Sequence, residues 1–236
     1  MLEIVQLLSL INEPESDYHD FKEKWYKKEQ KSELVKDIFS FVNTTHENDC
    51  YIILGISDDG ELVGIENDEN RKNQQNLIDF ISHLPIANDA IPKIYLESFD
   101  LDEHTIDVIV IPNTKNVPIY LSSKYPSKRQ DGRQITPGII YSRIGDVNTS
   151  IDSITNFYQV EELWRKHFRL NVPIQTRYEF ILKDVKNWSY IHHDENHGFI
   201  YNLDPDFFVA IEEDDECNCQ VELCTFCQIT LCTFVT

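Results

Sequence analysis

The apolar run at residues 51–56 is the feature of this chain that most constrains its fold. It reads Tyr51-Ile52-Ile53-Leu54-Gly55-Ile56, which is rich in the β-branched and aromatic side chains that favour strands. The turn signal Asp58-Asp59-Gly60 follows directly, and residues 62–65 can return as the second strand of a hairpin. A strand that is apolar on both faces has to be covered on both, so the sequence predicts a central strand of a sheet.

Further helices and strands are predicted on either side of this run from the periodicity of apolar residues. They alternate without a regular β-α-β rhythm, so we expect an α+β fold in which helices flank a mixed β-sheet. The expected helices lie around 34–42, 77–84, 154–168 and 178–183. The expected strands lie at 94–99, 105–111, 117–121, 138–145, 199–201 and 207–211.

The chain of 236 residues has room for one large domain and a small appendage. We place the boundary so that residues 1–165 form the main α+β domain and residues 166–236 form a smaller, acidic, Cys-rich α/β appendage. We also expect a cleft in the main domain near the end of the 51–56 strand, bordered by the hairpin.

Charge is distributed unevenly along the chain. The net charge is −20, but ten of the acids and none of the lysines or arginines lie in residues 187–236. Such a charge run is usually a solvated, solubilising face, and an acidic segment that shields a basic cleft is the alternative. The overall charge therefore does not exclude a nucleic-acid partner, which basic residues in the first part of the chain would bind.

Five of the six cysteines crowd the C-terminal end, at positions 217, 219, 224, 227 and 232. The spacing between the pairs is too short for a zinc ribbon, so we do not expect structural zinc at Cys217, Cys219, Cys224 and Cys227. No stretch approaches 18 apolar residues, and the start of the chain resembles a short amphipathic helix better than a signal peptide. We therefore expect a cytoplasmic protein without a membrane partner.

Three carboxylates are candidates for a site. Asp58 follows a buried strand, where sheets present side chains to clefts, whereas spacing alone does not bring Glu15 and Asp20 together. Three converging carboxylates would repel one another and would need a hard divalent ion such as Mg²⁺ or Mn²⁺. The alternative is that Glu15 and Asp20 are surface acids and that Asp58 only stabilises its turn.

Several of these motifs together resemble a known family. Residues 15–22, Glu-Ser-x-x-x-Asp-Phe-Lys, are similar to the E-S-x-x-x-E-F-K pattern of the Schlafen AlbA-type domain. The strand and hairpin at 51–65 resemble the next part of that domain, and residues 140–145 resemble its closing Y-x-R-x-G strand. The resemblance covers about residues 8–165 in the same order.

The resemblance implies a function and a set of site residues. In catalytically active Schlafen proteins three carboxylates form a metal-dependent RNA endonuclease site, and these positions fall on Glu15, Asp20 and Asp58. Lys22 matches the family lysine, which can neutralise a phosphate or hold a carboxylate. Asp20 is one methylene shorter than the family's Glu, and the Gly-Gly that follows Asn-Thr in the family is missing. The expected chemistry is attack of metal-activated water on a phosphate of RNA, with tRNA as a candidate substrate.

The competing interpretation is a non-catalytic DNA-binding or regulatory module. Nucleotide binding is less favoured, because the chain contains no P-loop motif. Both main interpretations predict a basic rim that contacts RNA or DNA, although solvated helix and loop faces would show the same charges. A homodimer is left open. The expected rim consists of Lys24, Lys27, Lys28, Lys128, Arg129, Arg133 and Arg143.

Overall fold

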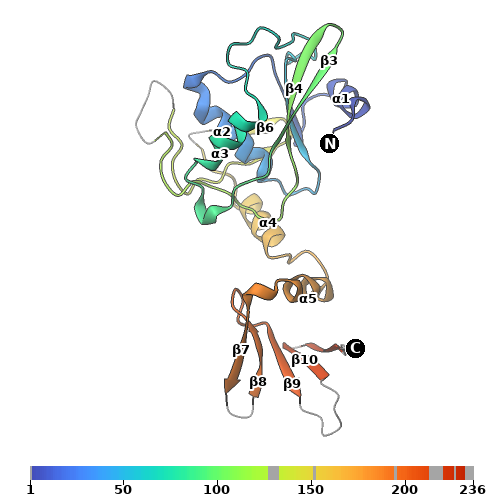
Figure 1. Ribbon diagram of the computed structural model, residues 1–236, viewed down its shortest axis with the longest axis vertical. Helices are drawn as coiled ribbons and strands as arrows, with labels where there is room; N and C mark the ends of the chain where they lie inside the picture. The colour runs from blue at the N-terminus through green and yellow to red at the C-terminus, as the bar shows by residue number, and fades with distance from the viewer. Residues whose placement is uncertain are drawn as a thin grey trace. The chain divides into compact units, whose positions relative to one another are not determined.

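The computed structural model (Figure 1) describes residues 2–126, 133–150, 153–193, 196–212, 220–225 and 227–231. The chain divides into two compact units, Met1–Asn171 and Val172–Thr236. The first unit contains a mixed sheet flanked by helices, and the second contains a small sheet, so the predicted α+β class is confirmed. Every helix in the described ranges is too short or too polar to span a lipid bilayer.

The sheet of the first unit has the strand order β1-β2-β4-β3. The strands are β1 (His19–Lys22), β2 (Cys50–Leu54), β3 (Tyr95–Leu101) and β4 (His104–Ile111). β1 runs parallel to β2, whereas the β2–β4 and β4–β3 pairs are antiparallel. A parallel pair needs a crossover connection, and the chain between β1 and β2 provides one that contains helix α2 (Lys31–Val42).

Both faces of β2 are covered, as its apolar sequence predicts. Ile52 and Leu54 belong to one hydrophobic core, and Ile53 belongs to a second core on the other face. Helices α2 and α3 (Gln74–Ser82) contribute to the first core, and α1 (Ile4–Ile11) contributes to the second (Figure 1). Each of these buried side chains stabilises the fold by roughly 1.5–3 kcal/mol relative to exposure.

The predicted helices of the first unit are present. The apolar stripe of α2 is buried. Asn73 caps the N-terminus of α3, and its side chain accepts a hydrogen bond from the Asn76 N–H at 2.8 Å. Helix α4 (Phe157–His167) closes this unit and buries Leu163. Ile78, an apolar residue inside the predicted helix at 77–84, is 45% exposed.

Three expected strands differ from the structure. Residues 62–65 and 117–121 form only single bridges, Ile56 to Leu62 and Ile86 to Leu121. In the second case the Asn43 side chain bonds both the N–H and the C=O of Ile119, so these backbone groups need no strand partner. In place of one strand at 138–145 the chain forms a short hairpin whose two strands, β5 (Arg143–Ile144) and β6 (Val147–Asn148), have two residues each.

The second unit contains one antiparallel sheet, in the order β11-β10-β9-β8-β7. Helix α5 (Ile174–Lys183) contributes Tyr178 to a small core that also contains Tyr201, Phe207 and Val209. The strands are β7 (Trp188–His193), β8 (Asn196–Tyr201), β9 (Phe208–Glu212), β10 (Gln220–Thr225) and β11 (Cys227–Leu231). Short 3₁₀ helices occupy Lys28–Gln30, Ala87–Asp89 and Val185–Asn187.

Candidate functional site

Asp20 is a buried carboxylate in the middle of β1. Asp20 as a whole is 3% exposed, and it lies opposite Ile52 in the parallel pairing of β1 with β2. A carboxylate removed from water needs compensating partners, and two cations provide them. Lys22 forms an ion pair with Asp20 Oδ2, and Arg143 Nη2 lies 3.0 Å from Asp20 Oδ1. Both carboxylate oxygens of Asp20 therefore face positive charge.

Glu15 lies beside Asp20. Its Oε1 accepts a hydrogen bond of 2.7 Å from the Phe21 N–H, and its Oε2 is 3.8 Å from Arg143 Nη2. Burial raises the pKa of Glu15, the Phe21 hydrogen bond opposes that rise, and the nearby charge of Asp20 adds to it. The folded chain thus brings together two acids that their spacing in the sequence does not place on one face.

Arg143 lies at the centre of this arrangement. Its Nε donates to the carbonyl oxygen of Ser16 at 2.6 Å, and its Nη1 donates to Asn148 Oδ1 at 3.1 Å. The guanidinium lies 5.0 Å from the centre of the Phe41 ring. The contact of Nη2 with Asp20 is an ion pair that lacks hydrogen-bond alignment.

The position of Arg143 corrects one expectation. We expected Arg143 on an exposed basic rim, but its side chain is only 1% exposed. The physical reason is that two acids and several backbone and side-chain acceptors hold the guanidinium inside the fold. In this conformation Arg143 positions Glu15 and Asp20 and presents no charge to a ligand.

Asp58 occupies a different environment from the two other acids. It is exposed, in a turn where the Gly60 N–H donates to the Ser57 carbonyl and the Ser57 N–H donates to the Glu61 carbonyl. Across the described ranges, no three or more His, Cys, Asp or Glu side chains gather in a way that could hold a metal ion. As arranged, Glu15, Asp20 and Asp58 do not fit a preformed metal site, because a metal ion at Asp20 would have to displace Lys22 or Arg143.

A lysine segment, residues 22–31, runs from β1 to the start of α2. Two aromatic residues anchor it, since Trp25 is 1% and Tyr26 6% exposed. The Trp25 Nε1–H donates to Asp107 at 2.9 Å, and the Tyr26 hydroxyl donates to Asp37 at 2.7 Å. Burial, followed by the charge of Asp37, raises the pKa of Tyr26 well above its ordinary value, so the hydroxyl keeps its proton. The anchored backbone leaves four lysines exposed, Lys24, Lys27, Lys28 and Lys31.

The family model described as Schlafen, AlbA_2 matches residues 15–152, which is more than half of the chain. The match begins at Glu15 and includes β1, the lysine segment and the hairpin that carries Arg143. The chain belongs to the Schlafen AlbA_2 family. The family resemblance seen in the sequence motifs is therefore confirmed.

Two solved structures resemble this Schlafen AlbA_2 chain. The DIP2311 protein from Corynebacterium diphtheriae is 17% identical with a TM-score of 0.42, over 69% of this chain and 28% of that one. The N-terminal domain of an ATP-dependent DNA helicase RecG-related protein from Nitrosomonas europaea is 16% identical with a TM-score of 0.37. This match covers 67% of this chain and 97% of that one. At these scores neither likeness supports a statement about activity. No curated protein matches the chain.

Other predicted site residues of the Schlafen AlbA_2 chain fall in different places. Arg133 is exposed, and Lys22 pairs with Asp20. Lys128 and Arg129 lie outside the described residues, as do Cys217 and Cys219. The backbones of Cys224 and Cys227 belong to β10 and β11.

Arg71 and Lys72 were missed in the sequence. Arg71 Nε and Nη2 donate to the buried carboxylate of Asp107 at 3.0 and 2.9 Å, which fixes the loop that follows Ile65. Lys72 lines a pocket next to the lysine segment. An Arg-Lys pair in a polar loop was the available signal, but such pairs are usually solvated.

Proposed function

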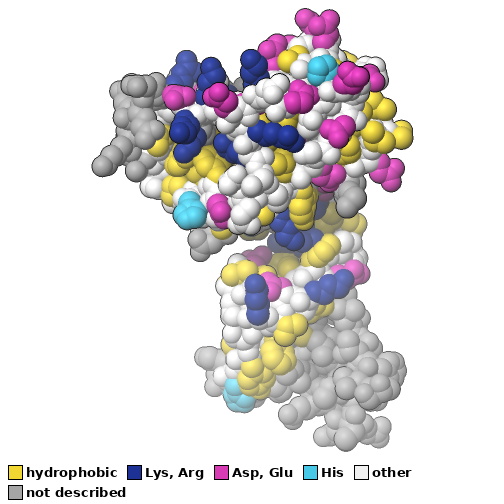
Figure 2. All heavy atoms as spheres, turned by 45° about the horizontal axis from the view of Figure 1, so that its top comes forward, with side chains coloured by type: hydrophobic (Ala, Val, Ile, Leu, Met, Phe, Trp, Pro, Cys, Tyr) yellow, Lys and Arg dark blue, Asp and Glu magenta, His cyan; other side chains and the backbone are white. Residues whose placement is uncertain are grey.

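We propose that the first unit of this chain binds nucleic acid through the lysine segment. The observation that carries the proposal is the anchoring of this segment by Trp25 and Tyr26, which holds four exposed lysines on a fixed backbone. Cations on an anchored backbone lose less backbone freedom on binding than cations on a mobile loop. Figure 2 shows Lys and Arg side chains on the visible face of this unit, with Asp and Glu side chains among and beside them.

The net charge of the chain is −20, so attraction of a nucleic acid has to come from a local group of cations. Ten of the 41 acids lie in residues 187–236, and the other 31 lie with all 21 lysines and arginines in residues 1–186. Charges separated by more than a Debye length of about 8 Å at physiological salt are largely screened. Local lysines therefore dominate the attraction of a phosphate backbone at the lysine segment.

A second candidate is metal-dependent cleavage of RNA, with tRNA as one substrate and Mg²⁺ or Mn²⁺ as the metal. One observation favours it, which is that Glu15 and Asp20 lie beside each other and next to Lys22. The proposed roles are metal ligands for Glu15, Asp20 and Asp58 and phosphate neutralisation for Lys22, and they require Lys22 to leave Asp20 when the metal binds. The metal would supply an activated water and stabilise charge on the phosphate.

The binding proposal is tested by fluorescence anisotropy of the full chain with a labelled RNA hairpin and a DNA duplex. Affinity should fall steeply between about 50 and 200 mM salt, because phosphate contacts release counterions. The double variant Lys24→Glu/Lys27→Glu should weaken binding and lower the salt slope by about 2, roughly one for each lost phosphate contact. The matched control is Lys93→Glu, a charge reversal at an exposed lysine outside the lysine segment. Affinity that ignores salt would contradict the proposal.

The cleavage candidate needs its own experiment. The full chain is incubated with total tRNA and a DNA duplex in Mg²⁺, Mn²⁺ or EDTA, and the products are resolved on a denaturing gel. The variants Glu15→Gln and Asp58→Asn should abolish cutting and leave binding in place. If the wild-type chain binds RNA and cuts nothing with any metal, binding without cleavage is the function of this unit.

A further inference from the structure

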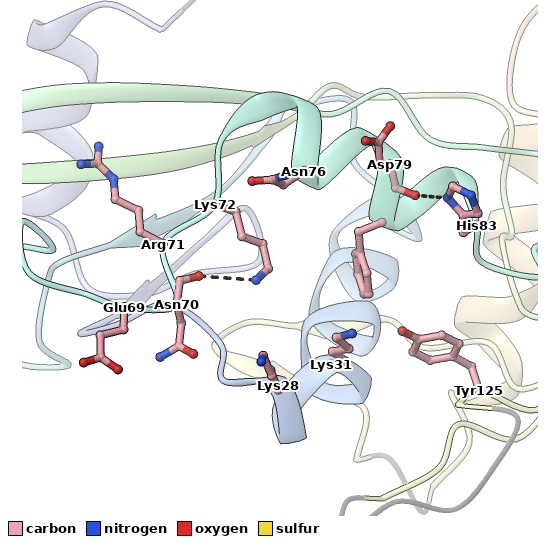
Figure 3. A pocket seen from close by; sticks show the side chains of 11 residues that line it. Lys28, Lys31, Glu69, Asn70, Arg71, Lys72, Asn76, Asp79, His83 and Tyr125 are labelled. Atoms are coloured by element: carbon pink, nitrogen blue, oxygen red, sulfur yellow. Dashed lines mark hydrogen bonds between the residues drawn. The ribbon is translucent and has the colours of Figure 1, made fainter.

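A pocket of about 550 Å³ lies beside the lysine segment (Figure 3). Its wall comes from the start of α2, the loop at residues 69–72, helix α3 and Tyr125. This volume lies within the range of roughly 300–1,000 Å³ that small organic ligands occupy. The pocket is separate from the Glu15–Asp20 pair, since neither acid lines it.

Three lysines that line this pocket have no ion-pair partner among the residues that the structure describes. In the described part of the chain, no carboxylate lies within ion-pair distance of Lys28, Lys31 or Lys72, and Lys72 Nζ donates only to the Asn70 carbonyl at 3.4 Å. Burial and then the positive charge of Lys31 lower the pKa of Lys72, and the charge of Asp68 opposes this shift. Lysines that lie close together and form no ion pair favour an anionic ligand.

The other charged residues that line the pocket either bond to a neighbouring side chain or point away from the three lysines. Arg71 points away from the lysines in Figure 3 and is paired with Asp107. The Asp79 carboxylate accepts a hydrogen bond from Gln75 at 2.7 Å, and Glu69 points outward in the same view. The three lysines therefore dominate the charge inside the pocket.

Aromatic rings form the opposite part of the wall. Phe80 and Tyr125 are half-buried, and their ring centres lie 6.2 Å apart at 76° in an edge-to-face arrangement. The Tyr125 side chain extends toward the space beside Lys31 (Figure 3). An aromatic face next to cations is the combination that binds single-stranded nucleic acid, since bases stack on the ring and phosphates pair with the cations.

We infer that this pocket holds one nucleotide from an unpaired stretch of the bound strand, with its phosphate at Lys28, Lys31 and Lys72 and its base against Tyr125 or Phe80. The inference rests on the proposed function, because Lys28 and Lys31 belong both to the lysine segment and to the pocket. That shared position is the reason for assigning a strand, and not a separate small molecule, as the occupant. A duplex keeps its bases stacked inside and would have to unpair and unstack one to place it in the pocket.

The experiment compares a labelled single-stranded oligonucleotide with a duplex of the same sequence, by anisotropy on the full chain. Tyr125→Ala should weaken binding of the single strand by about fivefold or more, the lower end of the effect of losing one stacked base. Lys72→Gln should weaken single-strand binding and lower its salt slope by about one. Both variants should leave duplex binding within about twofold, and Tyr125→Phe should retain single-strand binding because the ring remains.

Controls separate a failure of the pocket from a failure of the proposed function. Lys93→Gln, at an exposed lysine that does not line the pocket, should bind both ligands like wild type. If wild type binds neither ligand, the proposed function fails. If wild type binds both and the folded Tyr125 and Lys72 variants bind the single strand unchanged, or lose both ligands equally, the pocket assignment alone is wrong. Tighter binding of a free nucleoside monophosphate than of the single strand would also overturn the assignment to a strand.

Discussion

Arg143 and Asp20 form an ion pair of 3.0 Å in which the side chains are only 1% and 4% exposed. Asp20 belongs to β1 near the start of the chain, whereas Arg143 belongs to the β5–β6 hairpin. The same guanidinium bonds the Ser16 carbonyl and Asn148. This one side chain therefore links the β5–β6 hairpin to β1 and contacts both Glu15 and Asp20.

Replacement of Arg143 by Met should destabilise the first unit strongly. The change leaves Asp20 buried with only Lys22 as a partner, and breaking a buried pair in this way costs about 3–5 kcal/mol. Urea unfolding measures the loss in free energy. Arg143→Lys should recover only a small part of it, because an ammonium cannot reach Ser16, Asn148 and Asp20 at once. The double variant Asp20→Asn/Arg143→Met should lose less than the sum of its single changes, and strict additivity would contradict this account of the pair.

Glu15 should make stability depend on pH. Its pKa in the folded state is raised above the ordinary 4.5, mainly by burial, so the folded state holds this proton at pH values where the unfolded state has lost it. Stability associated with Glu15 is therefore full below the unfolded pKa and falls as pH rises through the folded pKa. Glu15→Gln should flatten this part of the curve of unfolding free energy against pH. A carboxyl ¹³C titration that places Glu15 at or below 4.5 would refute the prediction.

Trp25→Phe tests the anchor of the lysine segment. The change keeps most of the apolar volume but removes the Nε1–H bond to Asp107, whose carboxylate is completely buried. Arg71 and Ser98 still bond that carboxylate, so the expected loss is about 1–3 kcal/mol. Nucleic-acid affinity should fall together with stability. Trp164→Phe is the matched control, because Trp164 is 37% exposed and donates no bond to Asp107.

Gly55→Ala should destabilise the turn that follows β2. Gly55 has φ of +100°, and a Cβ there would lie 2.9 Å from Ile106 Cδ1 and 3.2 Å from the Thr105 carbonyl oxygen. Backbone conformations of this kind cost other residues about 1–3 kcal/mol, and the close contacts add to that. The melting temperature of the variant checks this. Gly138→Ala is the comparison, since Gly138 also has positive φ but its added Cβ would meet nothing within 4 Å. If the two variants lose the same melting temperature, the contacts of the added Cβ with Ile106 and Thr105 do not contribute.

The local pattern of apolar residues was sufficient to predict the elements that are held in place by burial of their own side chains. The apolar run at 51–56 predicts β2, and helical periodicity predicts α2, because burial of these side chains outweighs other local preferences. The stretch at 117–121 looks equally strand-like but forms no strand, because Asn43, which is distant in the sequence, bonds the backbone of Ile119. Periodicity cannot reveal a side chain that replaces a strand partner.

The sequence alone determined that this chain has an α+β first unit with a two-sided central strand, the Schlafen AlbA_2 motifs and lysines on either side of Trp25 and Tyr26. Those properties depend on residue type and on spacing within a few positions. Only the tertiary structure decided that Arg143 is buried next to Glu15 and Asp20, that Asp58 lies in an exposed turn, and that Lys72 and Lys31 line the same pocket. These relationships depend on contacts between residues far apart in the chain, and the energy of a buried charge is set by the partners that folding brings to it.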